Sequence, residues 1–99
     1  MSWEIYLAGN LIFAEGEVGE HNVDAFCQQL RSCFPAVGFN FRDLEIADGV
    51  SMAAMITFIR EVSPIEIHYA PQMLAHTLYK IGMLETGNIV LLNPRYDEN

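Results

Sequence analysis

Carboxylates and histidines are the side chains of this sequence that could carry out acid–base or metal chemistry. Glu15 and Glu17 stand two residues apart on one face of a predicted strand, the arrangement of a paired-carboxylate site. Acid–base catalysis also needs a cleft that shifts the pKa of such a group, and the sequence indicates none. His21, His68 and His76 lack the spacing of a zinc site, and a lone histidine within a strand is typical of a hydrogen-bonded structural residue. We therefore expect no catalytic residue and no metal, with both glutamates in water at a strand edge.

The cysteines and glycines, like the carboxylates and histidines, lack the spacing needed for catalysis or cofactor binding. Cys27 and Cys33 stand six residues apart on one predicted helix, about 240° apart around its axis, which is unfavourable for a disulfide. Their spacing is also not that of a metal knuckle or a redox pair. The glycines are isolated, so the sequence has no glycine-rich phosphate-binding loop. We expect buried, free thiols in a reducing cytoplasm, no cofactor and no enzymatic activity.

Composition and charge exclude several classes of protein. The 99 residues suffice for one domain over residues 1–99, and 52% of them are hydrophobic against 18% charged, the reverse of a disordered chain. No apolar run approaches the roughly 20 residues of a membrane span, and residues 1–4 lack the features of a secretory signal. Thirteen acidic and five basic residues give a net charge of −8. This charge repels nucleic acids and anionic lipid, so we expect neither as a partner.

Hydrophobic patterns predict five strands and three helices in one α/β domain. The strands are expected at residues 3–7, 11–18, 39–46, 65–69 and 89–92. The helices are expected from Val23 to just before Pro35, from about Gly49 to Glu61, and from Pro71 to about Ile81. The order is therefore β-β-α-β-α-β-α-β. A tight turn makes the first two strands antiparallel, and right-handed crossovers make the later strands parallel, so we predict a small mixed sheet with helices packed on it.

The second and third predicted helices carry the more specific expectations. Asp48 is expected to accept amide hydrogen bonds as the N-cap of the second helix. That helix is apolar on most of its circumference, which is typical of a helix within the core or covered by a partner. The third helix has these residues at core spacing: Met73, Leu74, Thr77, Leu78 and Ile81. Its polar row consists of Gln72, His76 and Lys80, and a C-terminal tail is expected from Tyr96.

One stretch of the sequence resembles a known family. Residues 39–59 read as an alternating strand, then Asp48-Gly49-Val50-Ser51, then a helix that starts Met52-Ala53-Ala54-Met55. This resembles the STAS family, the sulfate-transporter and anti-sigma-factor-antagonist domains, in which a strand ends in Asp-Ser-Ser-Gly or a close variant before a helix rich in Leu and Ala. Residues 11–30 look like the family's second strand and first helix. Residues 65–84 look like its later strand, proline-containing junction and helix, so the resemblance covers nearly the whole chain.

The sequence departs from the family at the residue that carries its switch. In the anti-sigma-factor antagonists, a serine at the start of this helix is phosphorylated by a partner kinase, and the phosphate controls partner choice. Aligned on Asp48, Val50 takes the phospho-acceptor position and has no hydroxyl, while Ser51 takes the position of the glycine. Gly19 stands where the family has an aspartate after the second strand. The resemblance thus implies that the phospho-switch is absent, unless a shift of register makes Ser51 the phosphorylated residue.

The resemblance implies a regulatory domain that binds another protein in the cytoplasm. We expect the partner to contact five consecutive residues, Asp48, Gly49, Val50, Ser51 and Met52, which we call the 48–52 junction. The partner would be a kinase-like anti-sigma regulator, a sigma-factor pathway component or another signalling protein. The alternative is an accessory subunit of an ABC-type lipid transport system, and a third class is binding of a nucleotide or lipid. The free edge of the first strand also offers a surface for a homodimer.

Overall fold

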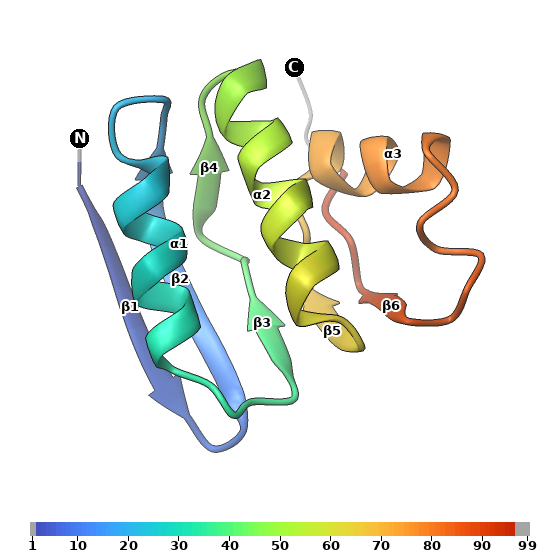
Figure 1. Ribbon diagram of the computed structural model, residues 1–99, viewed down its shortest axis with the longest axis horizontal. Coiled ribbons are helices and arrows are strands. Elements are labelled where there is room, and N and C mark those ends of the chain that lie inside the picture. The colour runs from blue at the N-terminus through green and yellow to red at the C-terminus, as the bar shows by residue number, and fades with distance from the viewer. Residues whose placement is uncertain (1, 97–99) are drawn as a thin grey trace.

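The computed structural model describes residues 2–96, and these form six strands and three helices. The elements are β1 (Trp3–Ala8), β2 (Leu11–Val18), α1 (Val23–Ser32), β3 (Gly38–Asn40), β4 (Leu44–Ile46), α2 (Gly49–Val62), β5 (Ile65–His68), α3 (Gln72–Lys80) and β6 (Ile89–Leu92). They form one α/β domain, as the sequence predicts (Figure 1). The expected C-terminal tail lies outside the described residues beyond Tyr96.

The strands form a single mixed sheet. Along the sheet the order is β1-β2-β3-β5-β6, and β4 also pairs with β2. The hairpin β1–β2 is antiparallel, with Trp3 opposite Gly16 and Ala8 opposite Leu11. The pairs β2–β3, β2–β4, β3–β5 and β5–β6 are all parallel. Both expectations, an antiparallel first pair and parallel later pairs, are confirmed.

The expected continuous strand over residues 39–46 is wrong, because a turn divides it into β3 and β4. The side-chain oxygen of Asn40 accepts a hydrogen bond from the amide of Arg42 at 3.1 Å, and the amide of Leu44 donates to the carbonyl of Phe41 at 3.1 Å. These local bonds take the backbone out of the ladder for three residues. As a result β3 lies between β2 and β5, whereas β4 pairs with β2 alone.

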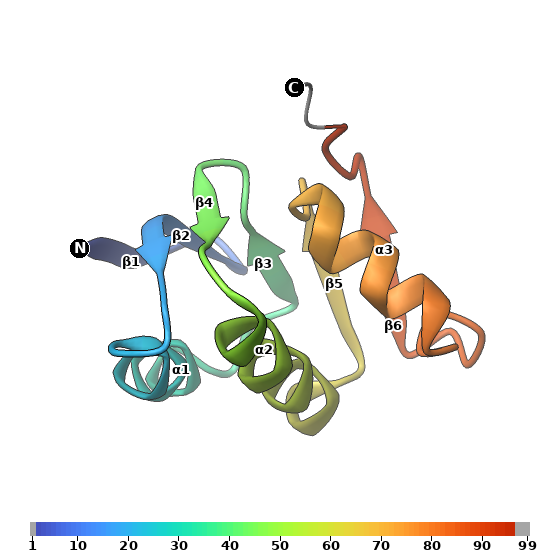
Figure 2. The same ribbon diagram turned by 90° about the horizontal axis from the view of Figure 1, so that it is seen from above.

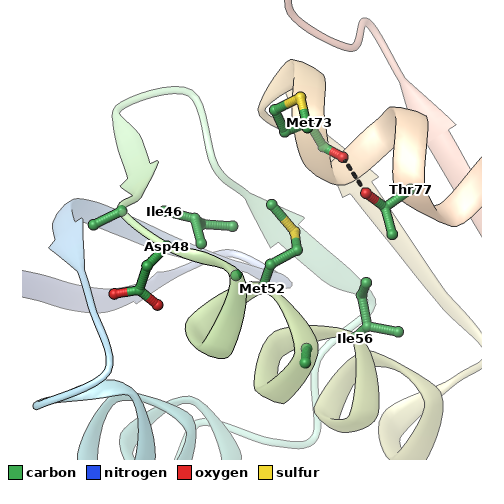
Figure 3. A pocket seen from close by; sticks show the side chains of 9 residues that line it. Ile46, Asp48, Met52, Ile56, Met73 and Thr77 are labelled. Atoms are coloured by element: carbon green, nitrogen blue, oxygen red, sulfur yellow. Dashed lines mark hydrogen bonds between the residues drawn. The ribbon is translucent and has the colours of Figure 1, made fainter.

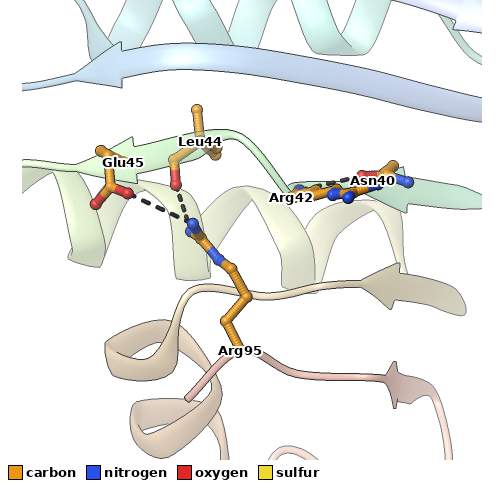
Figure 4. A network of polar contacts seen from close by, with 5 residues as sticks. All are labelled: Asn40, Arg42, Leu44, Glu45 and Arg95. Carbon is orange, nitrogen blue, oxygen red and sulfur yellow. Dashed lines mark hydrogen bonds and ion pairs between the residues drawn. The ribbon is translucent and has the colours of Figure 1, made fainter. Parts of the chain in front are cut away.

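The C-terminal segment ties β4 to the rest of the molecule. The guanidinium of Arg95 donates to the carbonyl of Leu44 and lies 3.4 Å from the carboxylate of Glu45 (Figure 4). Its backbone amide donates to the carbonyl of Ala70 at 2.9 Å. An unpaired strand edge needs such partners because its peptide groups must be hydrogen-bonded. Arg95 thus supplies one backbone hydrogen bond to β4 that a neighbouring strand would otherwise give, and an ion pair to the Glu45 side chain.

The hydrophobic core lies between the helices and one face of the sheet. α1 and α2 lie side by side on this face (Figure 2), and α3 follows them next to α2. Strand residues at alternate positions, such as Ile12, Phe39 and Ile67, point into the core and are buried. The other strand residues point to the opposite face, where no helix of residues 2–96 lies; we call this the open face. The protein therefore has two layers, which agrees with its shortest extent of 22 Å.

Two hydrophobic residues that were expected at core positions of the third helix lie outside the core. Leu74 and Leu78 are buried as predicted, but Met73 is 62% exposed and Ile81 is 49% exposed. α3 has nine residues and packs by the narrow stripe of its two leucines. Met73 is displaced from this stripe by the rotation of one helical residue, and Ile81 follows the last helical residue as the C-cap. The exposure of Met73 bears on the candidate site.

Candidate functional site

Asp48 organises the start of α2 by accepting three hydrogen bonds. Its Oδ1 accepts from the amide of Ser51 at 2.8 Å and from the hydroxyl of Ser51 at 2.5 Å. Its Oδ2 accepts from the amide of Glu20 at 3.0 Å, which joins the β2–α1 loop to the start of α2. The expected N-cap is therefore confirmed. These contacts lower the pKa of Asp48. The hydrogen bond from the Ser51 hydroxyl contributes most, followed by the bonds from the amides of Ser51 and Glu20 and by the nearby His21.

This lowered pKa gives a prediction about acid stability. The folded-state pKa of Asp48 lies below the unfolded value of about 3.9. The stabilisation of the fold by the ionised Asp48 carboxylate is therefore complete above about pH 3.9, and it is lost as the pH falls through the folded-state pKa. We expect Asp48→Ala to lower the thermal unfolding midpoint by roughly 4–8 °C at pH 7, the effect of one lost N-cap in a domain of this size. Calorimetric scans from pH 7 to pH 3 should show the difference narrowing below about pH 4.

The control for this prediction is Asp43→Ala, in the turn between β3 and β4. Its backbone carbonyl accepts from the amide of Gly16, a bond that the substitution retains, and Asp43 caps no helix. We expect a smaller change of the unfolding midpoint than for Asp48→Ala. Equal losses in the two variants would contradict the capping role of Asp48.

Ser51, the alternative phosphorylation site, is buried. Its relative exposure is 0%, and its hydroxyl donates to Asp48. A kinase must reach the hydroxyl, and a phosphate there would lie beside the Asp48 carboxylate and be repelled by it. Val50, which stands at the family's phospho-acceptor position, is 60% exposed and has no hydroxyl. The geometry therefore opposes phosphorylation of this junction as it stands.

The backbone at the first turn of α2 is accessible. Asp48 satisfies the amide of Ser51, and the amide of Met52 donates to the carbonyl of Asp48 at 3.1 Å. The amides of Gly49 and Val50 have no acceptor among residues 2–96. A Cβ built on Gly49 would meet no atom within 4 Å. A partner can therefore approach this turn closely and accept from its amides.

An apolar groove of about 490 Å³ opens beside the 48–52 junction. Figure 3 shows Met52 and Ile56 of α2 on one side and Met73 and Thr77 of α3 on the other. The hydroxyl of Thr77 donates to the carbonyl of Met73 at 2.7 Å, so this polar group is satisfied within α3. The remaining lining residues are Ile46, Ala47, Asp48, Gly49 and Ala53. Met73 and Thr77 thus lie next to the 48–52 junction. The sequence did not indicate this, because only the packing of α3 beside α2 brings the two residues there.

The other candidate residues lie apart from this groove. Glu15 and Glu17 are on the open face of β2, which is an inner strand and not the expected edge. Cys27 is buried with its sulfur 4.0 Å from that of Met55, and burial raises its pKa to about 11. Both Cys27 and Cys33 are free thiols, but only Cys27 is buried as expected, since Cys33 is partly exposed. Among residues 2–96 no group of three or more histidine, cysteine or acidic side chains is arranged to hold a metal ion.

Comparison with known proteins adds no assignment. A scan against models of protein families found no match, and a search of curated proteins found none either. In the part of the chain that the structure describes, none of the helices has the length and apolar character needed to cross a membrane. The geometry of the junction and the groove is therefore the basis for any function proposed here.

Proposed function

We propose that this chain is a STAS-like protein-interaction domain without enzymatic activity, which binds a partner protein through the 48–52 junction and the adjoining groove. The observation that carries the proposal is the apolar groove beside a helix start whose backbone is exposed. The order of strands and helices and the sequence at residues 48–51 support the STAS-like character. The partner would be a kinase-like regulator or another signalling protein.

The chemistry of the groove suits a protein side chain. Methionine side chains are flexible and polarizable, so Met52 and Met73 can adapt to an inserted apolar residue. Val50 and Met73 are 60% and 62% exposed, and covering them on binding would remove apolar surface from water. An amphipathic helix that docks between two helices is a common mode of such recognition. The accessible amides at Gly49 and Val50 would orient the partner by donating hydrogen bonds to its polar groups.

The proposal differs from the phospho-switch of the anti-sigma-factor antagonists. Ser51 is buried and Val50 has no hydroxyl. Binding at this junction would therefore be constitutive, or would be controlled by modification of the partner. In the anti-sigma-factor antagonists of the family that the sequence resembles, by contrast, phosphorylation of the domain itself controls binding.

A pair of arginine substitutions tests the site. Gly49→Arg places a large charged side chain in the lining of the groove, and Val50→Arg places one next to it on the exposed first turn of α2. The open space around Gly49 and the exposure of Val50 let the fold persist. The matched control is Val37→Arg, because Val37 is also exposed and lies far from the junction, in the loop before β3. Each tagged variant is used for capture from the native host, with quantitative mass spectrometry of the bound proteins and a check of folding by circular dichroism.

We expect one or more proteins to be recovered by the wild type and by Val37→Arg but lost with both junction variants. Equal recovery by all four proteins would refute the proposed site. The identity of the recovered protein separates the two roles, since a regulator or kinase would support signalling. An ATPase subunit of a transporter would instead support the accessory role in lipid transport.

A further inference from the structure

The open face of the sheet presents an ordered row of side chains across five strands. The register places Tyr6 opposite Phe13, Phe13 opposite Asn40, Asn40 opposite His68 and His68 opposite Leu92. Parallel sheets are usually covered on both faces, so an uncovered face with aromatic and aliphatic residues calls for an explanation. This face lies opposite the helices and is therefore separate from the proposed docking groove.

The aromatic part of the row is held in place before any ligand arrives. The rings of Tyr6 and Phe13 are stacked with centroids 5.2 Å apart and an interplanar angle of 4°. The hydroxyl of Tyr6 donates to the carboxylate of Glu15 at 3.1 Å. Tyr6 remains 44% exposed, so its ring offers a flat apolar surface to a partner. A preorganised aromatic surface lowers the entropy cost of binding.

Acidic side chains share the open face with this aromatic pair. The strand residues that share the open face by register include Glu4, Glu15, Glu17, Glu45 and Glu66. Two of these carboxylates have a partner, because Glu66 is hydrogen-bonded to a ring nitrogen of His68 at 2.8 Å and Glu45 lies 3.4 Å from the guanidinium of Arg95. Three of the five basic residues, Arg31, Arg60 and Lys80, belong to the helices of the other layer. Of the other two, Arg95 pairs with Glu45, and the guanidinium of Arg42 in the β3–β4 turn lies over the ring of Tyr69. The five carboxylates of the open face thus outnumber the basic side chains near it. The open face is therefore acidic as well as aromatic.

We propose that the open face binds a basic amphipathic segment of a partner protein. Lysine or arginine head groups of the segment would approach the carboxylates, and an arginine or lysine over Tyr6 would add a cation–π contact. Apolar residues and the aliphatic stems of the basic side chains would cover Tyr6, Phe13 and Leu92. A second copy of this chain fits less well, because two chains that each carry a net charge of −8 repel one another.

Binding of a synthetic peptide tests this proposal. The probe is a peptide of alternating lysine and leucine, compared with one of alternating glutamate and leucine, and calorimetry at low and high salt measures affinity for the full chain. The test variants are Tyr6→Ala and the double variant Glu4→Gln/Glu17→Gln, all at exposed positions. The matched control is Asp24→Asn/Glu85→Gln, which removes two exposed charges on α1 and in the α3–β6 connection.

We expect the lysine peptide to bind and the glutamate peptide not to bind, with an affinity that falls as salt increases. The Glu4→Gln/Glu17→Gln variant should weaken binding about 5-fold, from the loss of two exposed charge pairs, and Tyr6→Ala about 3-fold. The control should change it less than 2-fold. An equal loss in the control would show attraction by net charge alone and overturn the proposal, as would absence of binding or equal binding of both peptides.

Discussion

Replacing Gly38 by alanine should destabilise the protein by about 3 kcal/mol, the upper end of the usual cost of overpacking an interior. Gly38 pairs with Glu66 in the parallel ladder between β3 and β5. A Cβ at Gly38 would overlap the carbonyl oxygen of Glu66 and lie 3.0 Å from its carbonyl carbon. Both are backbone atoms, which cannot rotate away as a flexible side chain can. The two strands must therefore separate. This would also detach β6, which among residues 2–96 pairs with no strand but β5.

Gly49→Ala is the matched control for this prediction. A Cβ at Gly49 would meet no atom within 4 Å, and Gly49 is the first residue of α2. The alanine restricts the unfolded chain at this position, so we expect a stabilisation of about 0.4–1 kcal/mol. Urea unfolding followed by circular dichroism measures both variants. A Gly38→Ala protein with the midpoint of the wild type would contradict the close approach of β3 and β5.

Local sequence signals predicted the elements whose boundaries depend on neighbouring residues. β2 occupies residues 11–18 and β6 occupies residues 89–92, as the runs of apolar and β-branched residues indicate. Asp48 was predicted to be an N-cap because capping needs a short polar side chain a few residues before an apolar helix. A glycine inside a strand indicates a bulge or a close approach of backbones, and a Cβ at Gly16 would lie 2.7 Å from the Cα of Trp3. Each of these signals is contained within one short segment or one tight pair of strands.

Features that depend on how distant segments pack could not be predicted in the same way. The alternation of residues 39–46 is that of one strand, yet Arg42 and Asp43 lie in a turn between β3 and β4. The two strands that pair with this stretch differ in length, since β2 has eight residues and β5 has four. β2 therefore pairs with both β3 and β4, whereas β5 pairs with β3 alone. Hydrophobic spacing predicted Met73 to be in the core, but whether α3 buries one stripe or two depends on its position beside α2. The groove is therefore visible only in the tertiary structure.

The same limit applies to Ser51. A serine three residues after an N-cap aspartate is ordinarily on the surface, and the sequence left Ser51 as a candidate for phosphorylation. Its burial arises because Asp48 bonds both to Ser51 and to the amide of Glu20, which closes the β2–α1 loop against the start of α2. This contact joins segments 28 residues apart in the sequence. It turns an apparent modification site into a structural one.

Ser51→Asp, the substitution that mimics a phosphate, should therefore destabilise the protein by about 3 kcal/mol or more at pH 7. At an exposed third position of a helix a carboxylate is normally favourable, because it interacts with the helix dipole. Here the new carboxylate would be buried and would lie beside Asp48, which already accepts three hydrogen bonds. Ser51→Ala, which loses the hydroxyl bond but adds no charge, should cost about 0.5–1.5 kcal/mol.

The pH dependence distinguishes charge repulsion from a simple steric effect. Two adjacent carboxylates raise the pKa of one of them in the folded protein. A group whose folded-state pKa exceeds its unfolded value favours folding at low pH and disfavours it at neutral pH, so Ser51→Asp should recover stability relative to Ser51→Ala between pH 7 and about pH 4. Val50→Asp is the control, because Val50 is exposed and the carboxylate there gains about 0.3–1 kcal/mol from the helix dipole. Urea unfolding at several pH values measures all three. If Ser51→Asp is as stable as Val50→Asp, the hydroxyl of Ser51 is accessible after all, and modification of the junction becomes the better account of its regulation.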